Sequence, residues 1–352
     1  MAFFGITEEI IEKVWEHPNA DRLDLAKVYG MDFQFVVGKD SYKEGDKVLY
    51  FPIDSILPPD VIEKLGLTGR LAGKDHNRVK TVKLRGEVSQ GIVCRPETVL
   101  GNDREKWPYL NAEHLTDFLG VTKYDPPPEY TPTGILRPLP EGVGVYDIEE
   151  ADRYTDVAAS MLDEPVQITE KLEGTNTAIV REPDGTILYC QRENRIEELE
   201  DGKPNLYAET ARAQGVPKLM EELAEQFPGQ HITLRGEVIG YKVQGNIYQI
   251  NGNEIRFFDL QINHRYVDAE QFASLIPENH RVPVLAEGVT LREWLDGKTI
   301  QQASNGKSVL NPKTRREGIV VKPMRGRSEE FEGYIHRCII KQRSPEYLAK
   351  GK

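Results

Sequence analysis

The fold of this chain is decided by the stretch Glu170-Lys171-Leu172-Glu173-Gly174-Thr175-Asn176. A lysine that attacks phosphorus must first lose its proton, and nearby cations together with partial desolvation lower the pKa of an amine. The glycine three residues later lets a phosphate approach the backbone closely. Taken alone, the K-x-x-G pattern favours a surface lysine before a turn, so its meaning depends on the residues downstream of it.

Four further patterns occur in order: RGEVIG at 235–240, FFDL at 257–260, EGIVVK at 317–322 and IIKQR at 339–343, with Arg192 ahead of them. The ordered set resembles motifs I, III, IIIa, IV and V of the covalent nucleotidyltransferases. This superfamily contains ATP-dependent DNA ligases, RNA ligases and mRNA capping enzymes. Five motifs in this order and at plausible spacing make the resemblance strongly specific.

Displacing pyrophosphate from ATP places negative charge on the α-phosphate and on the leaving group, which cations must meet. Lys341 and Arg343 alternate with Gln342 on an expected strand, so both can face one pocket. RNA ligases usually carry K-x-K at this point, and a planar arginine fork replaces the second ammonium here. The expected catalytic residues are Lys171 as the nucleophile that carries AMP, with Lys322, Lys341 and Arg343.

Carboxylates in three of these motifs can hold a magnesium or manganese ion, directly or through its waters. They are Glu173, Glu237 and Glu317. The resemblance implies the same role, because the corresponding acids of related ligases bind metal-site waters.

The resemblance also implies a nucleotide site. Phe258 would stack on adenine, and the alternation of a strand places Phe257 in the core instead. Glu170 would read the adenine amino group, and Asp259 is either part of the site or a structural acid. The expected ATP- or AMP-binding residues are Glu170, Gly174, Asn176, Arg192, Glu237, Phe258, Lys322 and Lys341.

Short strands separated by turns are expected in the first ~120 residues, which is typical of a small closed barrel. They cover 25–28, 33–37, 47–51, 79–84 and 91–94. The segments HPNADRL at 17–23 and KLRGEVSQGI at 83–92 resemble the tRNA-binding OB-fold of some synthetases. We expect nucleic-acid contact there, although a purely structural barrel gives the same pattern.

A proline-dense stretch from Asp125 to Pro140 predicts a stiff connector rather than a core element. We expect an α+β fold, with an OB-fold at 1–122, a connector at 123–148 and a nucleotidyltransferase domain of antiparallel sheets flanked by helices at 149–352. The patterns in this last part predict a hairpin at 175–181 and 186–192, a helix over 206–226 broken near Gly215, and strands at 231–240, 255–262, 318–322 and 334–341.

We expect an OB-fold before the catalytic domain and no room for one after motif V. This domain order resembles that of the RNA ligases exemplified by the Naegleria and Deinococcus enzymes. The resemblance implies sealing of 3′-hydroxyl and 5′-phosphate ends of RNA, at nicks in duplexes, through lysyl-AMP. The partner would be RNA or a nicked duplex that contains RNA. The alternatives are a nucleic-acid-binding protein with an inactive catalytic domain, an ATP-dependent DNA ligase and a capping guanylyltransferase.

The composition restricts the setting of this activity. A net charge of −12 argues against non-specific coating of nucleic acid but allows a local basic cleft. Cys94, Cys190 and Cys338 are too widely spaced for a zinc site or a disulfide framework, which favours a reducing compartment. No membrane span or secretory signal is expected, and we expect a cytoplasmic or nuclear monomer.

Overall fold

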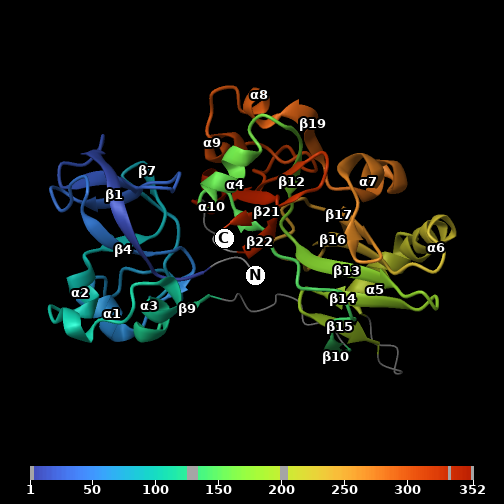
Figure 1. Cartoon of the computed structure of the whole chain (residues 1–352), viewed down its shortest axis with the longest axis horizontal. Helices are drawn as coiled ribbons and strands as arrows, with labels where there is room; N and C mark the ends of the chain where they lie inside the picture. The colour runs from blue at the N-terminus through green and yellow to red at the C-terminus, as the bar shows by residue number, and fades with distance from the viewer. Residues whose placement is uncertain (1–3, 125–133, 199–204, 332–333, 350–352) are drawn as a thin grey trace.

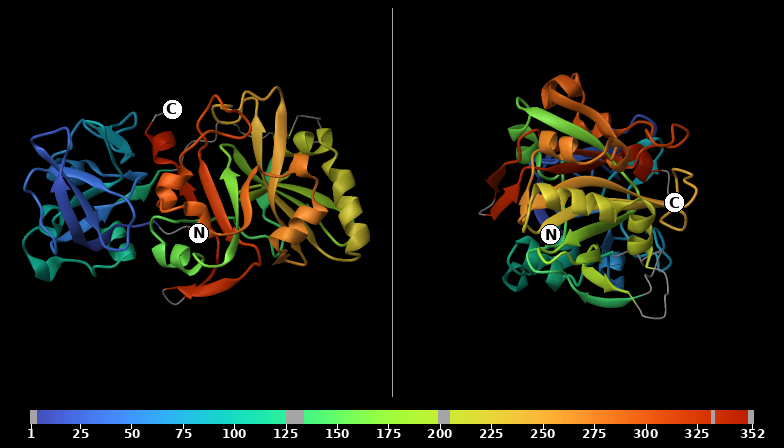
Figure 2. Two further views of the ribbon diagram at one scale, coloured as in Figure 1. Left: turned by 90° about the horizontal axis from the view of Figure 1, so that it is seen from above. Right: turned by 90° about the vertical axis from the view of Figure 1, so that its right-hand side faces the viewer.

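The computed structural model describes residues 4–124, 134–198, 205–331 and 334–349. A small barrel lies at one end of the molecule and two larger sheets with their helices lie at the other, as Figures 1 and 2 show. The fold class predicted from the sequence, a barrel followed by antiparallel sheets flanked by helices, is confirmed.

The N-terminal barrel is a nearly closed five-stranded sheet in the order β3-β2-β1-β4-β8. Its strands are β1 (Thr7–Glu16), β2 (Leu23–Val28), β3 (Phe35–Gly38), β4 (Lys47–Phe51) and β8 (Ile92–Cys94). β1 bridges the two halves because it pairs with β2 at one end and with β4 at the other. This long strand was not among the expected ones, since its glutamates and isoleucines do not alternate between polar and apolar.

Three short helices close one end of the barrel: α1 (Pro59–Lys64), α2 (Pro96–Leu100) and α3 (Ala112–Phe118). Their apolar residues pack with Leu49 and Phe51 of β4 into one core, and a second core on the other side contains Phe33, Phe35 and Tyr50. Of the expected strand 79–84 only β6 (Val82–Leu84) forms, and it pairs with β7 (Glu87–Ser89) as a separate hairpin. Two further short strands, β5 (Ser55–Ile56) and β9 (Thr122–Lys123), pair on the side that faces the larger sheets.

The larger sheet of the C-terminal part has the order β10-β15-β14-β13-β16-β17-β18. Its strands are β10 (Ile135–Pro138), β13 (Thr175–Arg181), β14 (Ile187–Gln191), β15 (Asn194–Glu197), β16 (Ile232–Gly240), β17 (Asn253–Ile262) and β18 (Arg265–Tyr266). Helices α5 (Leu206–Ala213), α6 (Val216–Gln226) and α7 (Ala269–Leu275) pack against this sheet. The predicted hairpin is confirmed, and so is the break between the two helices at Gly215, which has a φ of +72°.

The smaller sheet has the order β11-β23-β20-β12-β19. Its strands are β11 (Glu149–Glu150), β12 (Pro165–Lys171), β19 (Val284–Thr290), β20 (Gly318–Pro323) and β23 (Ile340–Arg343). Its core is covered by α4 (Thr155–Ser160), α8 (Leu291–Leu295) and α9 (Ile300–Ser304), and α10 (Pro345–Leu348) lies beside it, next to the barrel. β11 and β23 run parallel, and the other pairs are antiparallel.

Two expectations about these segments need correction. The expected strand 334–341 is two strands, because β22 (Tyr334–Arg337) pairs with β21 (Ser328–Phe331) and the chain turns at Cys338 before β23. Residues 125–133 of the expected connector lie outside the described residues. Its later part is no passive linker: β10 is an edge strand of the larger sheet, where a proline costs no ladder hydrogen bond.

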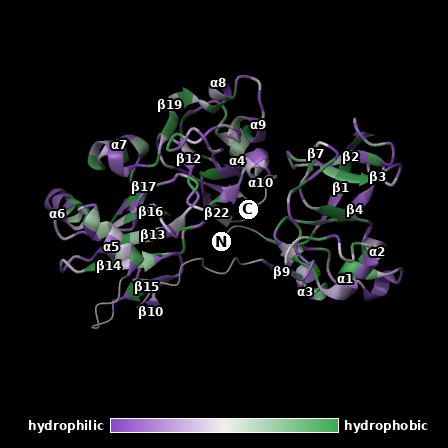
Figure 3. Ribbon diagram, turned by 180° about the vertical axis from the view of Figure 1, so that it is seen from behind, coloured by the Kyte–Doolittle hydropathy of each residue, from purple (hydrophilic) through white to green (hydrophobic). Residues whose placement is uncertain are grey.

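Seen from behind, α10 lies between the sheets of the C-terminal part and the barrel (Figure 3). In the part of the chain that the structure describes, no helix combines the length and the apolar character needed to cross a bilayer.

Gly91 offers a test of the barrel. Its φ is +95°, and a Cβ there would lie 2.4 Å from the Tyr50 ring and 2.8 Å from the Phe51 carbonyl oxygen. We expect Gly91→Ala to lower the free energy of unfolding by about 2–4 kcal/mol, from backbone strain and overpacking. Denaturant unfolding followed by circular dichroism measures this. Gly144→Ala is the control, because no atom lies within 4 Å of its added methyl group. Equal effects of the two changes would contradict this account of the barrel.

Candidate active site

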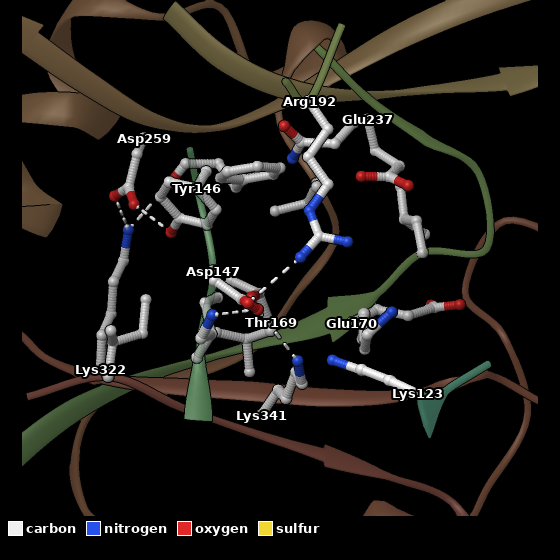
Figure 4. A pocket seen from close by; sticks show the side chains of 18 residues that line it. Lys123, Tyr146, Asp147, Thr169, Glu170, Arg192, Glu237, Asp259, Lys322 and Lys341 are labelled. Carbon is white, nitrogen blue, oxygen red and sulfur yellow. Dashed lines mark hydrogen bonds and ion pairs between the residues drawn. The ribbon is translucent and has the colours of Figure 1, made fainter. Parts of the chain in front are cut away.

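The motifs meet in a cavity of about 270 Å³ where the two sheets face each other (Figure 4). The turn 172–174 links the sheets directly, because Lys171 ends β12 and Thr175 begins β13. The cavity is lined by residues from every expected motif, among them Glu170, Lys171, Asn176, Arg192, Glu237, Phe258, Lys322 and Lys341. A larger cleft of about 600 Å³ adjoins it on the barrel side, lined in part by Lys171, Gly174, Glu317, Lys341 and Arg343.

Lys171 is held by a carboxylate on the neighbouring strand. Its Nζ donates to Oε1 of Glu317 at 2.7 Å, because β12 and β20 pair with Lys171 opposite Gly318. Burial acts to lower the pKa of Lys171, but the charges of Glu317 and Glu237 outweigh it and raise that pKa above its ordinary value. The expectation that the surroundings lower the pKa of this lysine is therefore wrong for the protein without substrate, and the amine is a cation here.

Gly174 is required for a different reason from the one expected. A Cβ at this position would lie 2.3 Å from the carbonyl oxygen of Val238 in β16. The turn therefore packs on the backbone of the larger sheet, and a side chain would push the two sheets apart. This packing requires glycine here independently of the expected approach of a phosphate, and the residue also lines the larger cleft.

Two of the three expected metal-binding acids face the lysine. Glu237 is a cause of the raised pKa of Lys171, and burial raises the pKa of Glu237 itself to about 8. Oε2 of Glu317 is buried with no hydrogen-bond partner among the described residues. Oxygen donors of this kind fit a divalent cation.

Glu173 does not belong with them. Its carboxylate accepts a hydrogen bond from the Tyr347 hydroxyl at 2.5 Å, and it lines neither cavity. Within the described ranges, no three His, Cys, Asp or Glu side chains are arranged to hold a metal ion. The expected three-carboxylate set is therefore not assembled. Glu173 is only two residues from Lys171 in the sequence, but the turn directs the two side chains into different surroundings.

Lys341 and Arg343, two of the expected phosphate-binding cations, are paired with acids that sequence reasoning missed. Lys341 contacts Asp147 at 3.5 Å, and Arg343 contacts Glu150 at 2.7 Å and Asp54 of the barrel at 3.6 Å. Lys341 and Arg343 do line one cleft, as their alternation predicts. The planar fork of Arg343 spans two carboxylates at once, which a single ammonium does less well. This pairing gives a physical reason for arginine in motif V of this chain.

Lys322 lies at the opposite end of the cavity. Its Nζ contacts Asp259 at 2.9 Å and donates to the Phe258 carbonyl oxygen at 2.8 Å. Asp259 also pairs with Arg337 at 2.6 Å, and the two cations hold the pKa of this carboxyl well below its ordinary value although burial opposes them. Asp259 is thus the buried centre of a charge cluster that fixes β17, β20 and β22 relative to one another.

Aromatic rings form one wall of the cavity. Phe258 faces it and Phe257 is fully buried in the core, as the alternation predicts. The ring of Phe258 lies 5.0 Å from that of Tyr146, whose hydroxyl donates to Asp259. Oε1 of Glu170 is buried with no hydrogen-bond partner among the described residues, so it remains available as an acceptor for a bound molecule.

Sequence reasoning missed Lys123, Tyr146 and Asp147, which also line the cavity. All three lie in the segment that was expected to be a connector. Figure 4 shows Lys123 pointing into the cavity from β9, and Asp147 between Arg192 and Lys341. A Tyr-Asp pair just before the catalytic domain is a weak indication of a functional site, because it belongs to none of the five motifs.

Glu237 makes the stability of the protein depend on pH. Its pKa is about 8 in the folded chain and has a reference value of 4.5. Between these pH values the folded chain holds a proton that the unfolded chain has released, so the free energy of unfolding falls as pH rises. Glu237→Gln cannot titrate. Urea unfolding from about pH 5 to about pH 8 is expected to show wild type losing stability relative to this variant. A difference that stays constant with pH would contradict the raised pKa.

Comparisons with known proteins agree with this geometry. The fold matches that of Naegleria gruberi RNA ligase: a variant bound to AMP and Mn has a TM-score of 0.77 and 23% identity, with 97% of each chain covered. The same ligase with PPi has a TM-score of 0.76 and 24% identity, with 99% of each chain covered. At these identities the similarity establishes the fold.

Curated sequences match a shorter part of the chain. The phenylalanine–tRNA ligase beta subunit of Geobacter metallireducens is 32% identical over 87 residues, which are 24% of this chain and 9% of that protein. The corresponding subunit of Dickeya dadantii is 31% identical over 96 residues, or 26% and 10%. The chain therefore spans about a tenth of the length of these relatives.

Two protein families match the chain. Residues 6–96 match an OB-fold domain, which agrees with the barrel. Residues 164–342 match the RNA ligase family and contain the first four motifs and all of the fifth except Arg343. Because this segment is just over half of the 352 residues, the chain belongs to the RNA ligase family.

Proposed function

We propose that the protein uses ATP to join a 3′-hydroxyl end and a 5′-phosphate end of RNA at a nick in a duplex. The observation that carries this proposal is a half-buried lysine beside two carboxyl groups, at the junction of a nucleotide-sized cavity and a larger cleft. The ATP and AMP in solved structures of Naegleria gruberi RNA ligase support a nucleotide at the same place.

The first step is attack of the Lys171 amine on the α-phosphorus of ATP. A nitrogen–phosphorus bond forms, the bond to the bridging oxygen breaks, and pyrophosphate leaves while the amine loses its protons. Phe258 and Tyr146 offer an aromatic wall for adenine, and Oε1 of Glu170 is placed to accept from its amino group. Lys341 and Arg192 face the cavity near the phosphates, where substrate oxygens would compete with Asp147 for them.

Lys171 must become neutral before it attacks. Glu317 holds its proton in place by its negative charge, and Glu237, whose pKa is about 8, adds to this effect once it is ionised. Glu237 and Glu317 would hold a divalent cation, magnesium or manganese, whose positive charge neutralises these acids and stabilises the phosphates. Once the acids are neutralised, burial is the remaining strong influence on Lys171, and it lowers the pKa of an amine.

Two further transfers complete the reaction. A 5′-phosphate oxygen of the nucleic acid attacks the phosphorus of lysyl-AMP, and Lys171 leaves as the free amine. The 3′-hydroxyl then attacks the activated 5′-phosphate, which releases AMP and forms the phosphodiester. Holding both ends in one cleft supplies the proximity that a bimolecular reaction lacks. We infer that both nucleic-acid ends bind in the cleft between the barrel and the sheets. We also infer that a single chain carries out the reaction as a monomer.

The first test is covalent labelling. With α-labelled ATP and magnesium or manganese, wild type is expected to retain label after denaturation, and Lys171→Ala is expected to retain none. Lys298→Ala is the control, since Lys298 is exposed beyond α8. No labelling of wild type would support a nucleic-acid-binding protein with an inactive catalytic domain, and labelling of Lys171→Ala would exclude Lys171 as the nucleophile. Labelling by GTP instead of ATP would identify a capping enzyme.

The second test is the chemistry of the nick. We expect a duplex nick with a 3′-hydroxyl ribonucleotide side to be sealed at least about tenfold faster than an all-DNA nick, because a ribose 2′-hydroxyl gives a protein a donor and an acceptor that DNA lacks. Single-turnover sealing on gels measures both rates. Equal rates on both nicks would favour a DNA ligase.

A further inference from the structure

The C-terminal helix reaches back to the motif I turn. α10 is fixed at its start, where Ser344 accepts a hydrogen bond from the Tyr347 amide at 3.2 Å and its hydroxyl donates to Asn305 at 2.7 Å. Arg315 pairs with Glu346 of the same helix at 3.2 Å. Figures 1 and 2 place this helix between the sheets and the barrel, and its last residue, Leu348, lines the larger cleft.

Two tyrosine hydroxyls meet at one residue of that turn. The Tyr347 hydroxyl donates to Oε2 of Glu173 at 2.5 Å, and the Glu173 amide donates to the Tyr248 hydroxyl at 2.6 Å. Glu173 is only 8% exposed and Tyr248 only 4%. A buried hydrogen bond to a carboxylate is about twice as strong as one between neutral groups, so these contacts restrain the turn firmly.

Packing removes the remaining freedom of the turn. Leu172 is buried in an apolar cluster with Ile239, Tyr248 and Val282. Gly174 lies against the backbone of β16 so closely that no Cβ fits. The three residues after Lys171 are therefore each fixed by a different contact, and only Glu173 is fixed by hydrogen bonds from two distant segments, the β16–β17 loop and α10.

We propose that Glu173 and Tyr347 are positioning residues: their hydrogen bond ties α10 to the motif I turn and so holds Lys171 in line for attack on ATP. This inference rests on the proposed function and adds the C-terminal helix to what adenylylation requires. It replaces the metal-ligand role that the sequence suggested for Glu173. A misalignment of the nucleophile lowers the rate of the chemical step with little change in nucleotide binding.

The experiment measures single-turnover adenylylation of the full chain as a function of ATP and of manganese. Tyr347→Phe removes only the hydroxyl and is expected to lower the maximal rate about tenfold, with the ATP concentration at half-maximal rate unchanged within about twofold. Tyr241→Phe is the matched control, because this tyrosine is 59% exposed in the same loop as Tyr248, and it is expected to react like wild type.

Two changes at Glu173 separate positioning from metal binding. Glu173→Ala is expected to slow the reaction at least as much as Tyr347→Phe, and adding Tyr347→Phe to it is expected to cause no further loss, because the two residues act through one bond. Glu173→Gln keeps an acceptor for the tyrosine and is expected to lose less than Glu173→Ala. Its half-saturating manganese concentration is expected to stay within about twofold of wild type.

Either of two results would overturn the inference: full activity of Tyr347→Phe, or a rise of about tenfold or more in the half-saturating manganese concentration of Glu173→Gln, as loss of a metal ligand requires. Circular dichroism shows whether each variant is folded. If Glu173→Ala does not fold, Glu173→Gln still distinguishes positioning from metal binding. If wild type is labelled on Lys171 and Tyr347→Phe is adenylylated at the same rate, this inference is contradicted but the proposed function is not. Wild type without label contradicts the proposed function, and the inference falls with it.

Discussion

The ion pair between Lys171 and Glu317 is the interaction on which the site depends. It spans the two central strands of the smaller sheet, β12 and β20, and it lies where the chain leaves that sheet to enter the larger one. Glu237 approaches from the larger sheet, so both sheets contribute charge to one lysine. A half-buried lysine in contact with the Glu317 carboxylate is stable as a cation, because the charges of the acids, above all that of Glu317, outweigh the effect of burial on the lysine pKa. In this arrangement Lys171 holds a proton that the proposed attack on ATP requires it to lose.

The same balance of charge extends through the cavity. Lys341, Arg343 and Lys322 each lie beside a buried or half-buried acid from another segment. Isolated charges are costly to bury, so a cleft rich in cations needs internal partners while no phosphate is bound. This pairing explains how a chain with a net charge of −12 keeps a basic phosphate site. Phosphate oxygens entering the site would exchange one set of anionic partners for another.

The barrel contributes directly to this arrangement. Lys123 of β9 lines the nucleotide cavity, and Asp54 near β5 pairs with Arg343 of motif V. Asp54 is in turn held by Arg78 at 2.6 Å, and the guanidinium of Arg78 lies 3.4 Å from the ring centroid of Tyr124, next to Lys123. Asp54, just before β5, and Lys123 of β9 lie on one pair of strands in the barrel, so this pair carries both contacts. The position of the barrel therefore determines whether Asp54 can pair with Arg343 of motif V. The β6–β7 hairpin of the barrel, on which Lys83 and Arg85 are exposed, contributes neither of these two contacts.

The sequence alone established the chemistry of the motifs, the order of the barrel and the sheets, and that Phe257 and Phe258 face opposite sides of their strand; the family resemblance pointed to Phe258 as the one at the site. These features depend on residue types in local patterns, and strand alternation is a local property. Only the tertiary structure decided the charge state of Lys171, the separation of Glu173 from Glu237 and Glu317, and the acids that pair with each cation. Asp54, the pair Asp147 and Glu150, and Tyr347 come from three segments far apart in the chain, and no sequence pattern connects them. Their roles arise when two sheets, a barrel and a final helix are packed around one turn, where burial makes each pairing strong.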